Sequence, residues 1–164
     1  GLALVLSVEE NITISSLDNL ASKLGFFKAS RLRMNAEKFT SALDIRIPSL
    51  KQEVLNLSGG NQQKVVISKW LLKDLNIINV DEPTRGIDVK TKNDIHKLLI
   101  GLKRAGKGII ITSPEVPELL SICDRILVIV SGEIVNEIKR LSSKFNEAAI
   151  IEAMHVGKKD SIQA

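Results

Sequence analysis

Two adjacent carboxylates follow a short apolar run in this chain. Asp81 and Glu82 come directly after Ile77-Ile78-Asn79-Val80. Charged groups at the end of a buried strand are costly, which favours a chemical role over a structural one. One carboxylate can hold Mg²⁺ through its water shell, and its neighbour can polarise an attacking water molecule. The pair therefore indicates metal-assisted hydrolysis, with Asp81 on the metal side and Glu82 as general base. Two helix-capping acids are the alternative.

A second candidate site stands about twenty residues earlier in the chain. Ser58, Gly59 and Gly60 precede an amphipathic stretch that is expected to be a helix. The first N–H groups of a helix lack intrahelical acceptors and its dipole attracts anions, while glycine lets a phosphate approach the backbone closely. A Ser-Gly-Gly triplet alone is often only a turn. Because both candidate sites occur in this order and are joined by one helix, the sequence favours a phosphate-binding site.

The elements that must position these residues are indicated by the spacing of apolar side chains. From residue 57 onward, apolar runs alternate with amphipathic stretches, which predicts βαβ units and a largely parallel sheet. Asp88 suits a helix N-cap, Gly106 suits the end of that helix, and Ser131-Gly132 suits a hairpin turn. The expected helices are 60–73, the stretch between Asp88 and Gly106, 114–123 and 146–155, and the expected strands are 75–80, 109–112, 125–130 and 133–138. The strand over 75–80 is nearly continuous in apolar residues, which predicts cover on both faces.

Residues 8–56 are more polar and are expected to be helical. Two helical faces are indicated by regular spacing, one by Leu17, Leu20 and Leu24 and the other by Ala36, Phe39 and Leu43. The expected division is a helical subdomain over 1–56, the C-terminal part of an α/β core over 57–156, and a frayed tail over 157–164.

Composition limits the class of protein. The 164 residues are 44% hydrophobic and 26% charged, with a net charge of +4 and a single cysteine, which cannot form an internal disulfide. A chain of this length can bury a core without a disulfide or metal. Its apolar runs are far shorter than the roughly 20 residues needed to span a bilayer. Aromatic residues make up only 3%. The densest basic stretch, residues 23–33, contains two phenylalanines but is interpreted as a solvated helix face over a small apolar patch, so a nucleic-acid binder is not favoured.

With both candidate sites in view, the sequence resembles the nucleotide-binding domain of ATP-binding cassette (ABC) transporters. Residues 57–62 (LSGGNQ) match the signature motif of that family, residues 77–82 (IINVDE) match its Walker B strand with the following glutamate, and residues 86–88 (GID) match its D-loop. The longer forms LSGGNQQKV and DEPTRGIDV resemble the C-terminal ATPase half of double-cassette importers of monosaccharides such as ribose, galactose and xylose. The likeness covers roughly residues 4–155.

The resemblance implies a fold, two cofactors and a set of roles. The fold would be α/β, a RecA-like P-loop ATPase core with a mostly parallel sheet and flanking helices, preceded by an α-helical subdomain. The cofactors would be ATP and Mg²⁺. In this family two cassettes dimerise head to tail, and the residues expected at the ATP of the partner cassette are Ser58, Gly59, Gly60, Asn61 and Gln62. Asp81 would be the metal-side acid and Glu82 the general base, with Gly86 and Asp88 forming the D-loop link between sites.

Two departures from the family pattern limit what the chain is expected to do alone. No G-x-x-x-x-G-K-[ST] phosphate loop occurs among its residues. The family places that loop upstream, so we expect the chain to be the C-terminal two-thirds or so of one cassette, and to be inactive in isolation. Ser113-Pro114-Glu115 stands where a switch histidine is usual. The sugar-importer second half commonly lacks that histidine.

The resemblance also implies partners and a location. The expected partners are an N-terminal ATPase cassette in the same or a second chain, the membrane permease subunits facing roughly residues 15–50, and indirectly a periplasmic or extracellular sugar-binding protein. Nucleic acid is not an expected partner, and the expected location is the cytoplasmic face of the cell membrane. Two alternatives remain open: a non-catalytic module that completes another cassette's site, and a soluble, non-transport ABC ATPase acting on DNA, RNA or ribosomes.

Overall fold

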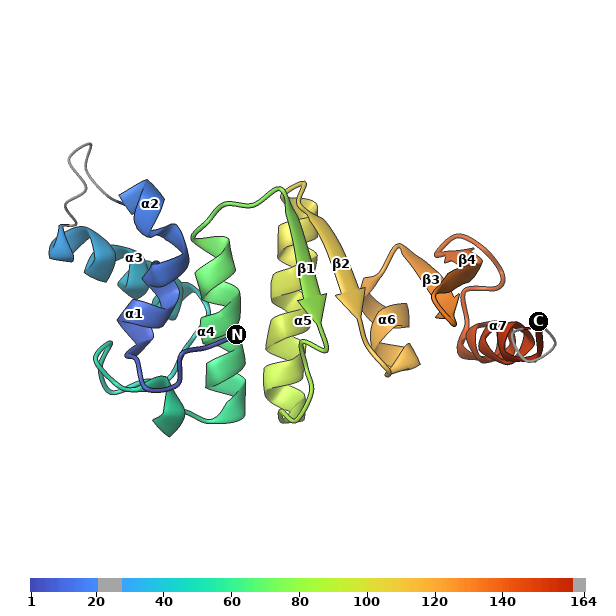
Figure 1. The fold of residues 1–164 in the computed structure, drawn as a ribbon, viewed down its shortest axis with the longest axis horizontal. Coiled ribbons are helices and arrows are strands. Elements are labelled where there is room, and N and C mark those ends of the chain that lie inside the picture. Colours follow the sequence, from blue (N-terminus) through green and yellow to red (C-terminus); the bar gives the residue numbers. More distant parts are fainter. Residues whose placement is uncertain (21–27, 161–164) are drawn as a thin grey trace. The chain divides into compact units, whose positions relative to one another are not determined.

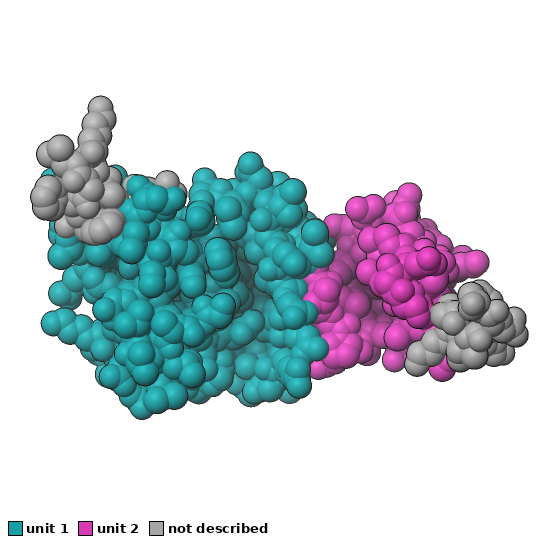
Figure 2. Space-filling view, viewed as in Figure 1, with its two compact units in different colours: residues 1–110 teal, residues 111–164 magenta. Residues whose placement is uncertain are grey.

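The chain divides into two compact units with separate cores. A computed structural model describes residues 1–20 and 28–160. Its contacts separate residues 1–110 (unit 1) from residues 111–164 (unit 2), which Figure 2 colours teal and magenta. The subdomain boundary expected at residue 56 falls inside unit 1. It therefore stays a prediction about subdomains and does not coincide with the division by contacts.

The first part of unit 1 is helical. Its elements are α1 (Val8–Thr13), a 3-10 turn (Ile14–Ser16), α2 (Leu17–Leu20), α3 (Ala29–Ala42), a second 3-10 turn (Val54–Asn56) and α4 (Gly59–Leu71), shown in Figure 1. Ser7 starts α1 with a capping box, in which the Ser7 hydroxyl accepts from the Glu10 N–H and the Glu10 carboxylate accepts from the Ser7 N–H. The core of this helical part of unit 1 is made by Val8, Ile12, Ala36, Ile45, Val54 and Val65.

Helix α4 is anchored to this core by its apolar face. Val65 is a fully buried member of this core, and Leu72 at the end of the helix packs against it. Burying one such side chain contributes about 1.5–3 kcal/mol. Helix α1 packs against both α3 and α4. The start of α4, where the Ser-Gly-Gly triplet lies, is therefore held in place by a buried helix rather than carried on a loose loop.

A strand, a helix and a second strand follow α4. They are β1 (Ile77–Asp81), α5 (Val89–Arg104) and β2 (Gly108–Thr112). Strands β1 and β2 are hydrogen-bonded neighbours, and their arrows run in the same direction in Figure 1. Asp88 is the N-cap of α5, as expected, and its side chain accepts from the Thr91 N–H. Gly106 has a φ of +84° and takes part in the paired backbone hydrogen bonds of a Schellman motif, which confirms its predicted place at the helix end.

The expectation that the first strand is covered on both faces was wrong for the described residues. Ile78 is 7% exposed, but Ile77 on the other face of β1 is 65% exposed. Ile110 in β2 is 57% exposed. An apolar run shows that a strand can be buried, but burial itself depends on which neighbours cover each face. Among the residues that the structure describes, only one face of this sheet is covered.

Unit 2 holds a hairpin between two helices. Its elements are α6 (Val116–Ile122), β3 (Arg125–Val130), β4 (Glu133–Lys139) and α7 (Glu147–Asp160). The strands are antiparallel, and Val130 pairs with Glu133 across the turn. Ser131 and Gly132 have φ values of +51° and +86°, which is the geometry of a type I′ turn and confirms the predicted hairpin. The core of unit 2 is made by Ile126, Val128, Ile138, Ile150 and Ala153.

The structure confirms one of the two helical faces expected in the first part of the chain and extends the last helix. Ala36 is fully buried, and Phe39 and Leu43 pack against the same core, as their spacing predicts. Leu24 of the first expected helix lies outside the described residues, and so do residues 161–164 of the expected tail. Helix α7 continues to Asp160, past the residue at which we expected it to end. None of the helices in the described part of the chain is long and apolar enough to cross a membrane.

Candidate functional site

Ser58 stands at the N-cap of α4 but does not cap the helix. Its backbone is extended (φ −60°, ψ 152°), yet its hydroxyl accepts no hydrogen bond from the first-turn N–H groups. The Ser58 hydroxyl oxygen instead lies 3.2 Å from Asn61 Nδ2. A serine at an N-cap ordinarily accepts from one of those N–H groups. The start of α4 therefore presents an exposed hydroxyl together with backbone donors that the serine does not fill, which suits an anion.

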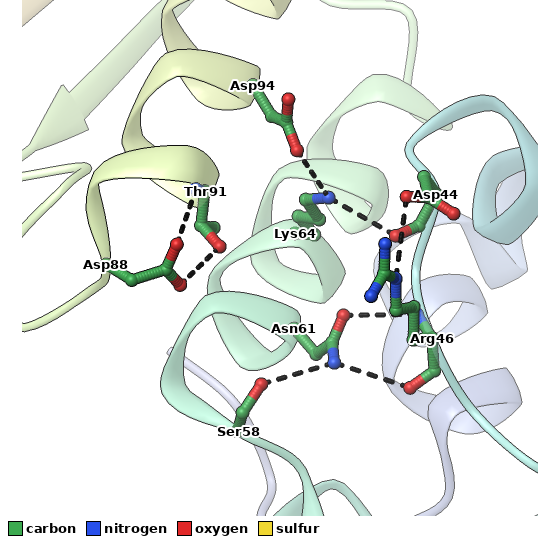
Figure 3. A network of polar contacts seen from close by, with 8 residues as sticks. All are labelled: Asp44, Arg46, Ser58, Asn61, Lys64, Asp88, Thr91 and Asp94. Carbon is green, nitrogen blue, oxygen red and sulfur yellow. Dashed lines mark hydrogen bonds and ion pairs between the residues drawn. The ribbon is translucent and has the colours of Figure 1, made fainter.

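The amide side chains of Asn61 and Gln62 bind their own chain. Asn61 Oδ1 accepts from the Arg46 N–H at 3.1 Å, and Asn61 Nδ2 donates to the Arg46 carbonyl at 3.3 Å, as Figure 3 shows. Gln62 Nε2 donates to the carbonyls of Val54 and Leu57 at 3.1 and 3.2 Å. These bonds fix the segments that lead to Ser58. The resemblance assigns both amides to ATP, and that role stays a prediction.

The two glycines of the triplet have different surroundings. A Cβ added at Gly60 would lie 2.7 Å from Thr91 Cγ2 and 2.9 Å from Thr91 Oγ1. A Cβ added at Gly59 would meet nothing nearer than the Gly86 carbonyl oxygen at 3.7 Å. Gly60 is thus required by the close approach of α4 to α5. Gly59 lies beside the backbone of Gly86, so the structure brings residues 58–60 and residues 86–88 together within unit 1.

Asp88 is held as an ionised cap at the start of α5. Its Oδ1 accepts from the Thr91 N–H at 3.0 Å and its Oδ2 accepts from the Thr91 hydroxyl at 2.7 Å. The backbone hydrogen bond, and after it the hydroxyl bond, hold the pKa of the Asp88 carboxyl below its usual value. The same Thr91 faces Gly60. One threonine therefore joins the cap of α5 to the start of α4.

Lys64 is a residue of this site that the sequence reasoning missed. Its ammonium group lies 3.3 Å from Asp94 Oδ2 in α5 and 3.2 Å from the Asp44 carbonyl oxygen (Figure 3). Only 6% of Lys64 is exposed. Its position one helical turn after Gly60 and one turn before the buried Ser68 was a usable signal, because a lysine on the buried face of a helix needs a partner.

Asp81 and Glu82 lie at the carboxyl end of β1, the edge where ligands bind in open α/β sheets. Glu82 has a φ of +43°, a left-handed conformation that costs a non-glycine residue roughly 1 kcal/mol. Its Oε2 lies 2.9 Å from the guanidinium of Arg85, which is 81% exposed. A pair so exposed contributes less than about 1 kcal/mol. The backbone turn, more than this ion pair, sets where the Glu82 carboxylate stands.

The residues present fit a magnesium ion that keeps most of its water. The carboxylate of Asp81 is an exposed hard oxygen ligand of the kind that Mg²⁺ takes. Within the described ranges, no group of three or more His, Cys, Asp or Glu side chains could enclose a metal. Waters and phosphate oxygens would have to complete the ligand set, which is usual for Mg²⁺ at phosphate sites.

Ser113, at the expected switch position, is engaged within unit 2. Its hydroxyl donates to the carboxylate of Glu118, a residue only 3% exposed. The same oxygen accepts from the Glu115 N–H at 3.1 Å. Ser113 therefore orders the turn that leads into α6, whose N-cap is Glu115.

Comparison with known proteins supplies the wider context for this geometry. No family model matches the chain. The ribose import ATP-binding protein RbsA 3 of Rubrobacter xylanophilus is 43% identical over 162 residues, which is 99% of this chain and 32% of that protein. The arabinose import ATP-binding protein AraG of Rhizobium etli is 41% identical over 148 residues, 90% of this chain and 29% of that protein. The chain is a homologue of bacterial sugar import ATP-binding proteins. It spans about a third of the length of these relatives.

Solved structures give the fold. A dimeric bacterial ABC transporter cassette is 26% identical with a TM-score of 0.74, and the match covers 87% of this chain and 60% of that one. A dimeric post-hydrolysis cassette bound to ADP and Pi is 24% identical with a TM-score of 0.76 over 87% of this chain and 60% of that one. This homologue of the import proteins thus has the fold of an ATP-binding cassette, as its motifs predict. Residues 57–62 and 86–88 are hereafter called the signature segment and the D-loop segment.

Proposed function

We propose that this chain supplies the signature side of an ATP site in a sugar-importing ABC ATPase. In this proposal its signature segment closes over ATP that is held by the phosphate loop of a partner cassette. The observation that carries this proposal is the start of α4, where the Ser58 hydroxyl is exposed and does not cap the helix. Beside it, Gly59 lies next to the Gly86 carbonyl. A nucleotide phosphate would there meet a hydroxyl, backbone N–H groups and the positive end of a helix. Sugar import as the coupled process rests on the names of the relatives.

The proposed roles are those that the motifs imply, and the positions of the residues support them. Ser58 donates its hydroxyl proton to a terminal phosphate oxygen, and Gly59 keeps the approach to the backbone open. Asp81 holds the hydrated Mg²⁺, which offsets phosphate charge when it is bound. Glu82 accepts a proton from the attacking water at a site whose phosphate loop belongs to the same cassette. Asp88 holds the D-loop segment against α5.

The signature role is tested in a mixed pair. The partner is a complete cassette from a homologous importer, in which the signature serine has been replaced by arginine. Two copies of this partner cannot close over ATP, because each lacks a working signature serine. ATP held by the phosphate loop of the partner can therefore be closed over only by the signature segment of this chain. We expect this chain to stimulate ATP hydrolysis by that partner, and we expect Ser58→Arg to abolish the stimulation because a long cation fills the place of a small donor. Ser143→Arg, the same change at an exposed residue of unit 2, is the matched control. Stimulation by Ser58→Arg equal to that by the control would reject the proposal.

Catalysis by Glu82 needs a separate experiment. The 164 residues contain no phosphate loop, so we expect no measurable hydrolysis by the chain alone. A chimera that joins the phosphate-loop segment of a homologous cassette in front of residue 1 is expected to hydrolyse ATP. Glu82→Gln should then lower its kcat by roughly 10²–10⁴-fold, the range for loss of a general base.

A second candidate function is a non-catalytic module that only completes the partner's site. The observation that favours it is the same lack of a phosphate loop within these residues. The two candidates differ in the chimera. If Glu82→Gln leaves the rate of the chimera unchanged while Ser58→Arg still blocks the mixed pair, the chain serves as a closing module and not as a catalyst.

We propose further that the partners are a second cassette and membrane permease subunits, with a sugar-binding protein acting through the permease. The cytoplasmic face of the membrane is the proposed location, because there ATP and a permease are both within reach. Co-purification of the tagged chain with permease subunits from a membrane fraction tests this, and recovery of the chain without them would count against it.

A further inference from the structure

The side chain of Asn61 connects the signature serine to a backbone segment fifteen residues earlier. It makes three hydrogen bonds, from Asn61 Nδ2 to the Ser58 hydroxyl oxygen at 3.2 Å, from Asn61 Nδ2 to the Arg46 carbonyl at 3.3 Å, and from the Arg46 N–H to Asn61 Oδ1 at 3.1 Å. Figure 3 shows the amide lying between Ser58 and Arg46. The contact is therefore a bridge and not a surface pair.

The backbone of Arg46 decides which way this amide faces. An N–H can only donate and a carbonyl can only accept, so Oδ1 must face the Arg46 N–H and Nδ2 must face the Arg46 carbonyl. The reversed amide would set two donors against each other and two acceptors against each other. The remaining hydrogen of Nδ2 is thereby directed at the Ser58 hydroxyl oxygen. Ser58 is the acceptor in this bond, and its direction is fixed by atoms whose roles cannot change.

The segment that holds the amide is itself fixed. Ile45, next to Arg46, is 7% exposed and belongs to the core of unit 1. The Asp44 carbonyl accepts from the buried ammonium group of Lys64. Among the residues that the structure describes, the contact given for the exposed Arg46 side chain is 3.7 Å long and made to the Asp44 carboxylate, whereas the Arg46 backbone makes both bonds to Asn61. A rigid support of this kind is what a precisely aimed donor requires.

We propose that Asn61 is a positioning residue that makes the Ser58 hydroxyl a hydrogen-bond donor toward nucleotide phosphate. A hydroxyl has one proton and two lone pairs. Because one lone pair is taken by Asn61 and the helix start does not use the hydroxyl as a cap, its proton is left for a ligand. Accepting one hydrogen bond also strengthens the bond that a hydroxyl donates. This inference rests on the proposed function, since it assigns Asn61 a role in the same site.

The test is a double-mutant cycle in the mixed pair, with Ser58→Ala and Asn61→Ala singly and together. We expect Asn61→Ala to lower kcat/KM for ATP about 5-fold, the loss of one neutral hydrogen bond worth about 1 kcal/mol. In the Ser58→Ala background the same change should have no further effect, because there is no hydroxyl left to orient. An equal loss from Asn61→Ala in both backgrounds would overturn the inference, since the amide would then act independently of the serine. If Ser58→Ala itself leaves kcat/KM unchanged, the proposed function fails first, and the inference fails with it.

Asn61→Asp separates orientation from fold stability. Its carboxylate still accepts from the Arg46 N–H and carries a charge that the start of α4 favours, but its second oxygen faces the Arg46 carbonyl, so the melting temperatures of Asn61→Asp and Asn61→Ala are measured beside their rates. However, a carboxylate has no proton for Ser58 and captures the hydroxyl proton instead. We therefore expect kcat/KM of Asn61→Asp to lie below that of Asn61→Ala whichever of the two variants melts at the higher temperature. A purely structural role predicts that the rates follow the melting temperatures, and a rate for Asn61→Asp equal to or above that of Asn61→Ala would overturn the inference.

Discussion

The ammonium group of Lys64 lies 3.3 Å from the carboxylate of Asp94, with 8% of the lysine side chain and 36% of the aspartate side chain exposed. This ion pair joins α4, which begins at the signature segment, to α5, which begins at the D-loop segment. Gly60 and Thr91 form a second junction between the same helices nearer their starts. These two contacts between α4 and α5 therefore set the distance between the signature segment and the D-loop segment, which are both expected to lie at the nucleotide.

Removing one partner of this ion pair should cost more than replacing the other by an apolar residue. Asp94→Ala leaves a buried ammonium group with the Asp44 carbonyl as its remaining bonded partner among those described here, and we expect a loss of about 1–3 kcal/mol in the free energy of unfolding. Lys64→Met keeps the buried volume and leaves Asp94 able to reach water, so its loss should be smaller. Urea denaturation of both variants measures the difference. A larger loss for Lys64→Met would show that the contacts of the ammonium group stabilise the fold by more than its burial costs.

Alanine at the two signature glycines should have unequal effects. Gly60→Ala forces a Cβ against Thr91, whose β-branched side chain is bonded to Asp88 and has little freedom to move, so we expect a loss of about 1–3 kcal/mol. Gly59→Ala is the matched control, since its Cβ would meet only ordinary contacts. Thr91→Ala in the Gly60→Ala background should recover part of the loss. Equal melting temperatures for the two single variants would contradict the close contact.

The stability of the α5 start should depend on pH through Asp88. Because the folded pKa of this carboxyl lies below its unfolded value of about 3.9, its contribution is fully present above that pH. It is then lost as the pH falls through the lowered folded pKa. Asp88→Asn keeps a capping oxygen without the charge, so it should remove this part of the acid dependence and lower the melting temperature at pH 7 slightly, toward the value that the native chain has once Asp88 is protonated. A ¹³C NMR titration of the Asp88 carboxyl gives the folded pKa directly, and an ordinary value there would refute the prediction.

Glycine-to-alanine changes outside the site should have opposite signs in the two units. Gly132 has a φ of +86° in the type I′ turn, so Gly132→Ala should lower the stability of unit 2 by about 1–2 kcal/mol. Gly101 lies inside α5, where an added Cβ meets nothing within 4 Å, so Gly101→Ala should raise stability by about 0.5–1 kcal/mol. Thermal melting followed by circular dichroism tests both. Two changes of the same sign would mean that one of these backbone assignments is wrong.

Local chemistry explains why some of the fold could be predicted from the sequence. The cap at Asp88, the helix end at Gly106 and the hairpin turn at Ser131-Gly132 each depend on a few neighbouring residues. The motif order indicated the cassette fold for the same reason, because the motifs are short and contiguous.

Tertiary contacts explain what the sequence left out. Arg46 lies 15 residues from Asn61, and Asp44 and Asp94 lie 20 and 30 residues from Lys64, so no local pattern reveals these contacts. Gly59 and Gly60 are identical in the sequence, and only the neighbouring helix distinguishes them. The exposed face of β1 was missed because an apolar run does not tell which neighbours cover it.

At position 82, the left-handed backbone makes thermal stability and the proposed catalysis favour different residues. Glycine adopts a φ of +43° without the steric penalty that glutamate bears there. A library of variants selected only for survival at high temperature should therefore enrich glycine at this position and lose the proposed general base. Keeping the carboxylate requires selection for turnover, and a stability-optimised version of this chain would have to exempt Glu82 from the design.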